Sequence, residues 1–140
     1  MKAAEPIEIF VASYKGSPEA GYGVFLQMGD IATEYSGVLG DFTKNQADLI
    51  SVIMALRCVK FEYRDRPAIL HGPSAYAVQT AERGSDGWLV KAKANQELVQ
   101  EVRESIESFK DIKIYRPKKQ DQFLKALEAA KACLKPKENN

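Results

Sequence analysis

The sequence predicts an α/β fold, in which a mixed five-stranded sheet carries helices on both faces. Two observations lead to this class. Three strand-like segments follow one another near the N-terminus, and two later strand-like segments are each followed by helix-like segments. The predicted order is therefore β-β-β-α-β-α-α-β-α. Right-handed crossovers through the helices would set the fourth and fifth strands parallel to the first.

The first three strands are predicted to form a meander. Residues 7–14 alternate apolar and polar side chains in the manner of a half-buried strand, and residues 21–28 and 31–39 supply the next two strands. Gly29 and Asp30 separate the second strand from the third. Glycine tolerates the positive φ that a two-residue hairpin turn requires, so a tight hairpin is expected there.

A well-marked helix follows the meander. Thr43 and Gln46 fit a capping box, in which the Thr hydroxyl accepts from the backbone N–H of Gln46 and the Gln side chain reaches back. The next apolar residues recur at helical spacing and predict one stripe that faces the sheet: Leu49, Val52, Ile53 and Leu56.

The second half of the chain alternates short strands and helices. Residues 68–71 are predicted as the fourth strand, and Pro73 stands where a first helical turn accepts proline, in a helix that runs to about Arg83. Asn95 is predicted to cap the following helix. Residues 112–115 then form the fifth strand, and residues 120–134 form a last amphipathic helix.

Length and composition indicate one globular domain. The chain has 140 residues, of which 45% are hydrophobic and 28% are charged, which is a globular balance. We expect a single domain over residues 1–135 and a disordered tail over residues 136–140. No apolar run approaches the roughly 18 residues that a membrane span needs, so no membrane partner is expected.

The cysteines and the N-terminus predict a cytoplasmic protein. Cys58 and Cys133 fall inside helical patterns without metal-type spacing, and we interpret them as reduced thiols in or near the core. The residues after Met1 contain no apolar segment of the kind that signal peptides carry.

The net charge of +1 conceals an uneven distribution. Residues 1–109 carry 11 Lys and Arg against 15 Asp and Glu, whereas residues 110–140 carry 9 against 4. A basic segment of this kind either presents a basic face to a polyanion or is simply a solvated helix and tail.

Four stretches in order resemble type 1 ribonuclease H, at near-constant spacing and over about residues 7–134. They are EIFVASYKGSPEAGYG (8–23), FTKNQADLISVIMAL (42–56), AILHGPSAYAVQT (68–80) and GWLVKAKANQELVQEVRESIESFKDIKIYRPK (87–118). In that family they correspond to the first hairpin, the first helix, the fourth strand with its helix, and the Trp-containing loop with a long helix and fifth strand. The resemblance implies a ribonuclease H-like fold.

The same resemblance implies a site that has lost most of its acids. The family cuts the RNA strand of an RNA–DNA hybrid with two Mg²⁺ ions, about 3.5–4 Å apart, held by carboxylates from four positions. Those positions fall on Ala12, Asp48, Pro73 and about Leu124. We therefore expect no catalytic residues, only weak metal binding by Asp48, and no cofactor. Mg²⁺ would be required only if activity is retained.

Nucleic-acid binding is the function that this resemblance would leave in place. The family grips the hybrid through sugar hydroxyls and phosphates. The residues expected to line the corresponding surface are Tyr14, Lys15, Lys44, Asn45, Gln46, Ser74, Trp88, Lys91 and Lys93. The leading hypothesis is a pseudoenzyme that binds an RNA–DNA hybrid or a double-stranded nucleic acid.

Purely structural roles for some of these residues, and two other functional hypotheses, remain open. Asn45 could simply occupy a position inside the capping box, and Trp88 could simply fill an apolar space between helices. A second hypothesis makes the former active-site mouth, lined by Ala12, Pro73 and Leu124, an apolar surface for a protein partner or a homodimer. A third is an active nuclease with relocated metal ligands, drawn from Asp41, Glu82 and Asp86.

Overall fold

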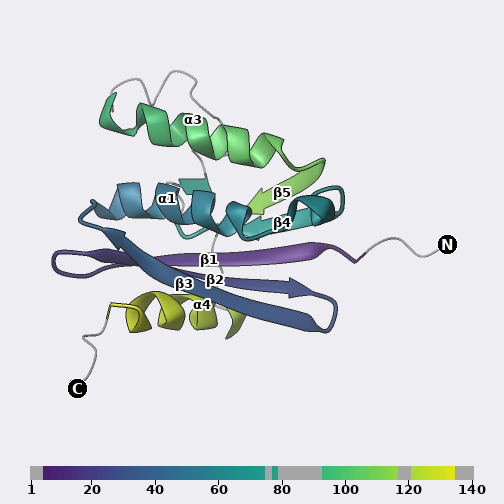
Figure 1. Ribbon diagram of the computed structural model, residues 1–140, viewed down its shortest axis with the longest axis horizontal. Coiled ribbons are helices and arrows are strands. Elements are labelled where there is room, and N and C mark those ends of the chain that lie inside the picture. The colour runs from purple at the N-terminus through teal and green to yellow at the C-terminus, as the bar shows by residue number, and fades with distance from the viewer. Residues whose placement is uncertain (1–4, 75–76, 79–92, 117–120, 135–140) are drawn as a thin grey trace.

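A five-stranded mixed sheet forms the centre of the molecule, with α1 and α3 on one face and α4 on the other (Figure 1). The computed structural model describes residues 5–74, 77–78, 93–116 and 121–134. The strands are β1 (Ile7–Lys15), β2 (Ala20–Met28), β3 (Ile31–Gly40), β4 (Pro67–His71) and β5 (Asp111–Tyr115). The helices are α1 (Lys44–Arg57), the 3₁₀ helix η1 (Phe61–Tyr63), α3 (Lys93–Glu107) and α4 (Asp121–Ala132).

The sheet has the predicted topology. Its strand order is β3-β2-β1-β4-β5. The first three strands pair antiparallel, and β4 and β5 run parallel to β1. Gly29, with a φ of 60°, supplies the left-handed residue in the hairpin between β2 and β3. The predicted parallel orientation of the two later strands relative to β1 is therefore confirmed.

The start of α1 is also confirmed. The backbone N–H of Gln46 donates to Thr43 Oγ1 at 3.1 Å, and the backbone N–H of Thr43 donates to Gln46 Oε1 at 3.0 Å. The cap predicted for the next helix is wrong, because α3 begins at Lys93 and Asn95 lies inside its first turn. Lysine and alanine are good helix formers, so the helix starts upstream of the asparagine.

The helix that was predicted from Pro73 to about Arg83 falls mostly outside the described residues, of which Ala77 and Val78 are helical. The predicted tail at residues 136–140 also lies outside them. Both cysteines are free, and burial raises the pKa of the Cys58 thiol to about 11. None of the helices in the described part of the chain is long and apolar enough to cross a membrane.

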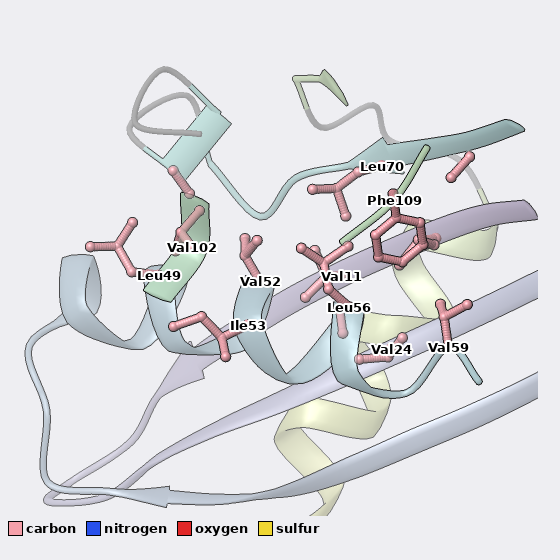
Figure 2. Packing of buried hydrophobic residues seen from close by; sticks show 14 of the residues in the cluster. Val11, Val24, Leu49, Val52, Ile53, Leu56, Val59, Leu70, Val102 and Phe109 are labelled. Atoms are coloured by element: carbon pink, nitrogen blue, oxygen red, sulfur yellow. The ribbon is translucent and has the colours of Figure 1, made fainter. Parts of the chain in front are cut away.

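The main core lies between the sheet and the layer of α1 and α3. Aliphatic side chains from α1 point toward β1, β2 and β4, and α3 adds its own buried face (Figure 2). The labelled members of this cluster are Val11, Val24, Leu49, Val52, Ile53, Leu56, Val59, Leu70, Val102 and Phe109. Alternation along β1 divides its side chains between this core and the opposite face.

A second, smaller core lies under α4. It contains Phe10, Ala12, Phe25 and Ala126, with Phe123 and Leu127 packed against it. The helix approaches β2 closely because Gly23 has no side chain. A Cβ at that position would lie 1.9 Å from the backbone oxygen of Ala126.

We expect Gly23→Ala to lower the free energy of unfolding by about 3 kcal/mol or more, because the new methyl group forces α4 away from the sheet. Gly37→Ala is the matched control in the neighbouring strand, since its Cβ would meet only the movable ring of Tyr22, at 2.8 Å. Urea unfolding followed by circular dichroism measures both. Equal stability losses would show that the contact between α4 and β2 is not limited by Gly23.

Candidate functional site

The last buried side chains of β1 point to opposite faces of the sheet. Ala12 belongs to the small core under α4 and is 1% exposed. Ser13, the next residue, points to the opposite face, where its hydroxyl meets α1. Ala12, the residue onto which the resemblance to ribonuclease H placed an acid, is therefore a buried methyl group beneath α4.

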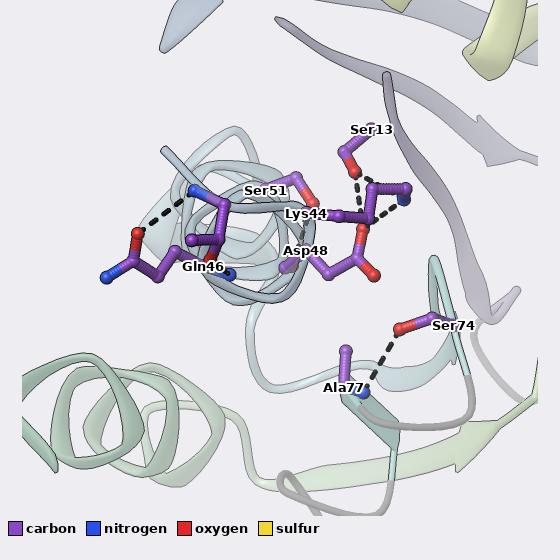
Figure 3. A network of polar contacts seen from close by, with 8 residues as sticks. Ser13, Lys44, Gln46, Asp48, Ser51, Ser74 and Ala77 are labelled. Atoms are coloured by element: carbon purple, nitrogen blue, oxygen red, sulfur yellow. Dashed lines mark hydrogen bonds and ion pairs between the residues drawn. The ribbon is translucent and has the colours of Figure 1, made fainter. Parts of the chain in front are cut away.

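Ser13, Lys44 and Asp48 form a compact polar network beside Ala12 (Figure 3). The Ser13 hydroxyl donates to Asp48 Oδ1. The Lys44 ammonium donates to the same oxygen at 2.6 Å and to Ser13 Oγ at 2.9 Å. Lys44 and Asp48 are four residues apart on α1, which places them on neighbouring turns of one helix face.

Burial makes this network important for Asp48. The residue is 1% exposed, and an isolated carboxylate would be costly at that depth. The Lys44 ammonium, half-exposed at the surface, supplies the compensating positive charge. Any metal ion that approached Asp48 Oδ1 would therefore compete with a cation that is already bonded to it.

Pro73 and Ser74 follow β4 near this network. Pro73 is buried, and its ring offers no ligand atom. Ser74 Oγ accepts from the backbone N–H of Ala77 at 3.2 Å, so this hydroxyl serves the local turn (Figure 3). Within the described part of the chain, no hydrogen bond joins this pair to Ser13, Lys44 or Asp48.

Leu124 does not join the predicted site. It is 45% exposed and lines a shallow groove between α4 and β3, together with Glu34, Lys125 and Glu128. Its neighbour Phe123 packs against the cluster that contains Ala12. Leu124 and Phe123 point in different directions because successive helical residues are rotated by about 100° about the helix axis. The expectation that Leu124 lines a common mouth with Ala12 and Pro73 is therefore not met.

The buried side chains at this end of the sheet do not fit a pair of Mg²⁺ ions. Mg²⁺ takes hard oxygen ligands, whereas these positions offer a methyl group, a proline ring and one paired carboxylate. Across residues 5–74, 77–78, 93–116 and 121–134, no group of three or more His, Cys, Asp and Glu side chains could hold a metal. Of the acids predicted as relocated ligands, Asp41 pairs with Lys15 at 3.2 Å, and Glu82 and Asp86 lie outside the described residues.

The residues predicted to bind nucleic acid are only partly placed. Lys15, Lys44 and Asn45 are exposed around the start of α1, and Gln46 is half-buried in the capping box. Tyr14 is exposed on the α4 face of the sheet. Trp88 and Lys91 lie outside the described residues, and of Lys93 only the backbone at the start of α3 is described. Sequence reasoning did not assign a role to Ser13 or to Lys131, whose ammonium lies 5.4 Å from the centre of the Tyr14 ring.

The only histidine of the chain stands apart from the network. The His71 ring stacks on Phe10 with centroids 4.2 Å apart, and its Nε2 lies 3.2 Å from Glu8 Oε1. This stacking places the imidazole on the α4 face, whereas Ser13 and Asp48 meet on the α1 face.

Comparison with proteins of known structure decides the fold. The chain superposes on ribonuclease H1 from the halophilic archaeon Halobacterium salinarum NRC-1 with a TM-score of 0.76, covering 92% of this chain and 97% of that one at 21% identity. The chain has a ribonuclease H-like fold. LC11-RNase H1, solved in complex with an RNA/DNA hybrid, gives a TM-score of 0.73, with 92% and 99% of the two chains covered at 18% identity.

Sequence comparison also finds a protein named ribonuclease H. A ribonuclease H from Geotalea uraniireducens (strain Rf4) is 33% identical over 91 residues, which cover 64% of this chain and 60% of that protein. The match thus spans less than two thirds of the relative's length. No protein-family model matches the chain. The chain therefore shares its scaffold with proteins named ribonuclease H.

We expect Lys44→Met to lower the free energy of unfolding by about 1–3 kcal/mol, because it leaves the buried Asp48 carboxylate without its cation. The double variant Lys44→Met, Asp48→Leu should recover most of this loss, since both members of the pair are then apolar. Chemical denaturation of the two variants and the parent chain measures the coupling.

Lys15→Met is the matched control for the Lys44 variant. It removes the same charge from a more exposed pair with Asp41, and such pairs contribute below about 1 kcal/mol. If the two lysine variants lose equal stability, Lys44 does not compensate a buried charge.

Proposed function

We propose that this ribonuclease H-like chain is a non-catalytic domain that binds nucleic acid, with an RNA–DNA hybrid as its preferred ligand, without using a metal ion. One observation carries the proposal: the Asp48 carboxylate is buried and bonded to Lys44 and Ser13, beside positions occupied by Ala12 and Pro73. This donor set supplies no second carboxylate for two-metal hydrolysis.

Lys44 supports the binding half of the proposal. An ammonium group has three N–H donors, and two of those on Lys44 are used by Asp48 and Ser13. Because the side chain is half-exposed, the third donor is accessible to a phosphate oxygen. The positive charge that neutralises Asp48 from one side would thus contact the nucleic-acid backbone from the other.

Exposed neighbours extend this surface. The capping box uses Thr43 and Gln46, so Asn45 is not needed for it, and the Asn45 amide has no hydrogen bond within the described part of the chain. Lys15 stands at the end of β1 near the start of α1, where it pairs with Asp41, whereas Tyr14 points to the α4 face, where the Lys131 ammonium lies over its ring. The resemblance also places a substrate-contacting asparagine of the family at Asn45. LC11-RNase H1, which has the same scaffold, was solved with an RNA/DNA hybrid bound to it.

The rival hypothesis of an apolar interaction surface at the former active-site mouth receives less support. Ala12 and Pro73 are buried, and Leu124 is exposed in the groove between α4 and β3. These residues therefore do not form one exposed apolar patch. The hypothesis of a relocated nuclease site rests on acids of which the described one, Asp41, already pairs with Lys15.

Fluorescence anisotropy with a short labelled RNA–DNA hybrid tests the proposal. We expect binding in EDTA that weakens steeply as salt rises, because Lys–phosphate contacts release counterions. Asn45→Ala should weaken binding about 3–10-fold, the cost of one lost polar contact, while leaving the Lys44–Asp48 pair intact. Lys60→Ala removes a charge just beyond the opposite end of α1 and should change affinity less than about 2-fold.

Two outcomes would contradict the proposal. Absence of binding at low salt would remove the nucleic-acid function. Cleavage of the hybrid in Mg²⁺ or Mn²⁺ that disappears in Asp48→Asn would show that the domain is catalytic.

A further inference from the structure

The two edges of the sheet differ in how they are protected. β5 is a five-residue edge strand with charged side chains at Asp111 and Lys113. β3 is a ten-residue edge strand, and its outer side pairs with no other strand in the described part of the chain. Short, charged edges resist pairing with other chains, whereas long uncharged ones invite it.

β3 has few of the features that usually block edge pairing. It contains no lysine and no proline, and Glu34 is its single charged residue. Its register with β2 is regular until a shift at the far end, near Gly40. Its exposed side chains include Ile31 at 64%, Val38 at 49% and Tyr35 at 39%. This edge therefore presents both free backbone groups and apolar side chains.

We propose that the outer edge of β3 pairs with β3 of a second copy of this chain, antiparallel and with Tyr35 on the two-fold axis. This interface is independent of the nucleic-acid surface. It would join two five-stranded sheets into one continuous sheet. An interface with two-fold symmetry must be self-complementary, and the sequence of β3 meets this condition in one register.

In that register no cross-strand pair sets like charges, or a charge and an apolar side chain, opposite each other. Tyr35 lies opposite Tyr35 of the second copy, and aromatic pairs of this kind are favourable. Glu34 lies opposite Ser36, and Ala32 lies opposite Val38, so the charge meets a hydroxyl and the apolar side chains meet each other.

The neighbouring registers are less favourable. Centring the axis on Glu34 would place two glutamates directly opposite one another, which is destabilising. Centring it on Ser36 would place Glu34 opposite Val38. Charge and apolar matching therefore select the register centred on Tyr35.

A groove beside this edge adds apolar surface on the α1 face. It has a volume of about 260 Å³ and is lined by Ile31, Thr33 and Tyr35 of β3 and by Cys58 and Tyr63. The second copy's Tyr35 would lie next to this groove. A single strand pair buries less than the roughly 800 Å² per partner of a standard interface, so we expect a dissociation constant in about the micromolar range.

Ser36 provides a matched pair of variants that test the register. Ser36→Lys would set each introduced lysine opposite Glu34 of the other copy, twice per dimer, whereas Ser36→Glu would create two repulsive contacts. We expect sedimentation velocity of the full chain at low salt to show dimerisation about 5-fold tighter for Ser36→Lys and about 5-fold weaker for Ser36→Glu than for the parent. Raised salt should reduce both differences.

Tyr115→Lys is the control, because it changes an exposed aromatic residue on the opposite edge of the sheet and should leave dimerisation unchanged. Circular dichroism confirms that each variant is folded. A parent chain that remains monomeric up to millimolar concentration would overturn the proposal. So would equal effects of the two Ser36 variants, or a loss of dimer in Tyr115→Lys alone.

Discussion

The ion pair between Lys44 and Asp48 determines what the site at the end of β1 can do. Asp48 is almost fully buried, and its Oδ1 receives both the Lys44 ammonium and the Ser13 hydroxyl. A buried carboxylate needs such partners, and once it has them a metal ion must displace a bonded cation to reach it. One short-range contact thus leaves the Asp48 carboxylate internally neutralised.

The surrounding fold places Lys44 at the protein surface with Asp48 buried beneath it. The capping box at Thr43 sets where α1 begins, so Lys44 stands on the first turn and Asp48 on the next, against the end of β1. Alternation along β1 then sends Ser13 toward α1 and Ala12 toward α4. Gly23 lets α4 approach the sheet and bury Ala12. The same local rules that build the scaffold therefore leave an ammonium group, rather than a cluster of acids, facing solvent.

Much of this architecture was predictable because it follows from local patterns. The hairpin glycine, the capping box and the alternation of strands gave the element order, and crossover handedness gave the sheet topology. The start of α3 was misplaced at Asn95 because helix propensity upstream outweighed a capping residue. That Leu124 is exposed while its neighbour Phe123 packs on the small core could not be predicted, because the phase of α4 decides it and one residue turns a helical side chain by about 100°. The spacing of Lys44 and Asp48 was visible, but its meaning depends on how deeply Asp48 is buried, which only tertiary packing decides.

A calorimetric titration of the intact chain with Mg²⁺ and then Mn²⁺, with a hybrid-cleaving ribonuclease H as the positive control, tests most directly whether the Lys44–Asp48 pair excludes metal ions. We predict no saturable metal binding by the parent chain, because the single carboxylate at the site is already paired with Lys44. Saturable binding of two ions per chain that is abolished by Asp48→Asn would contradict this prediction.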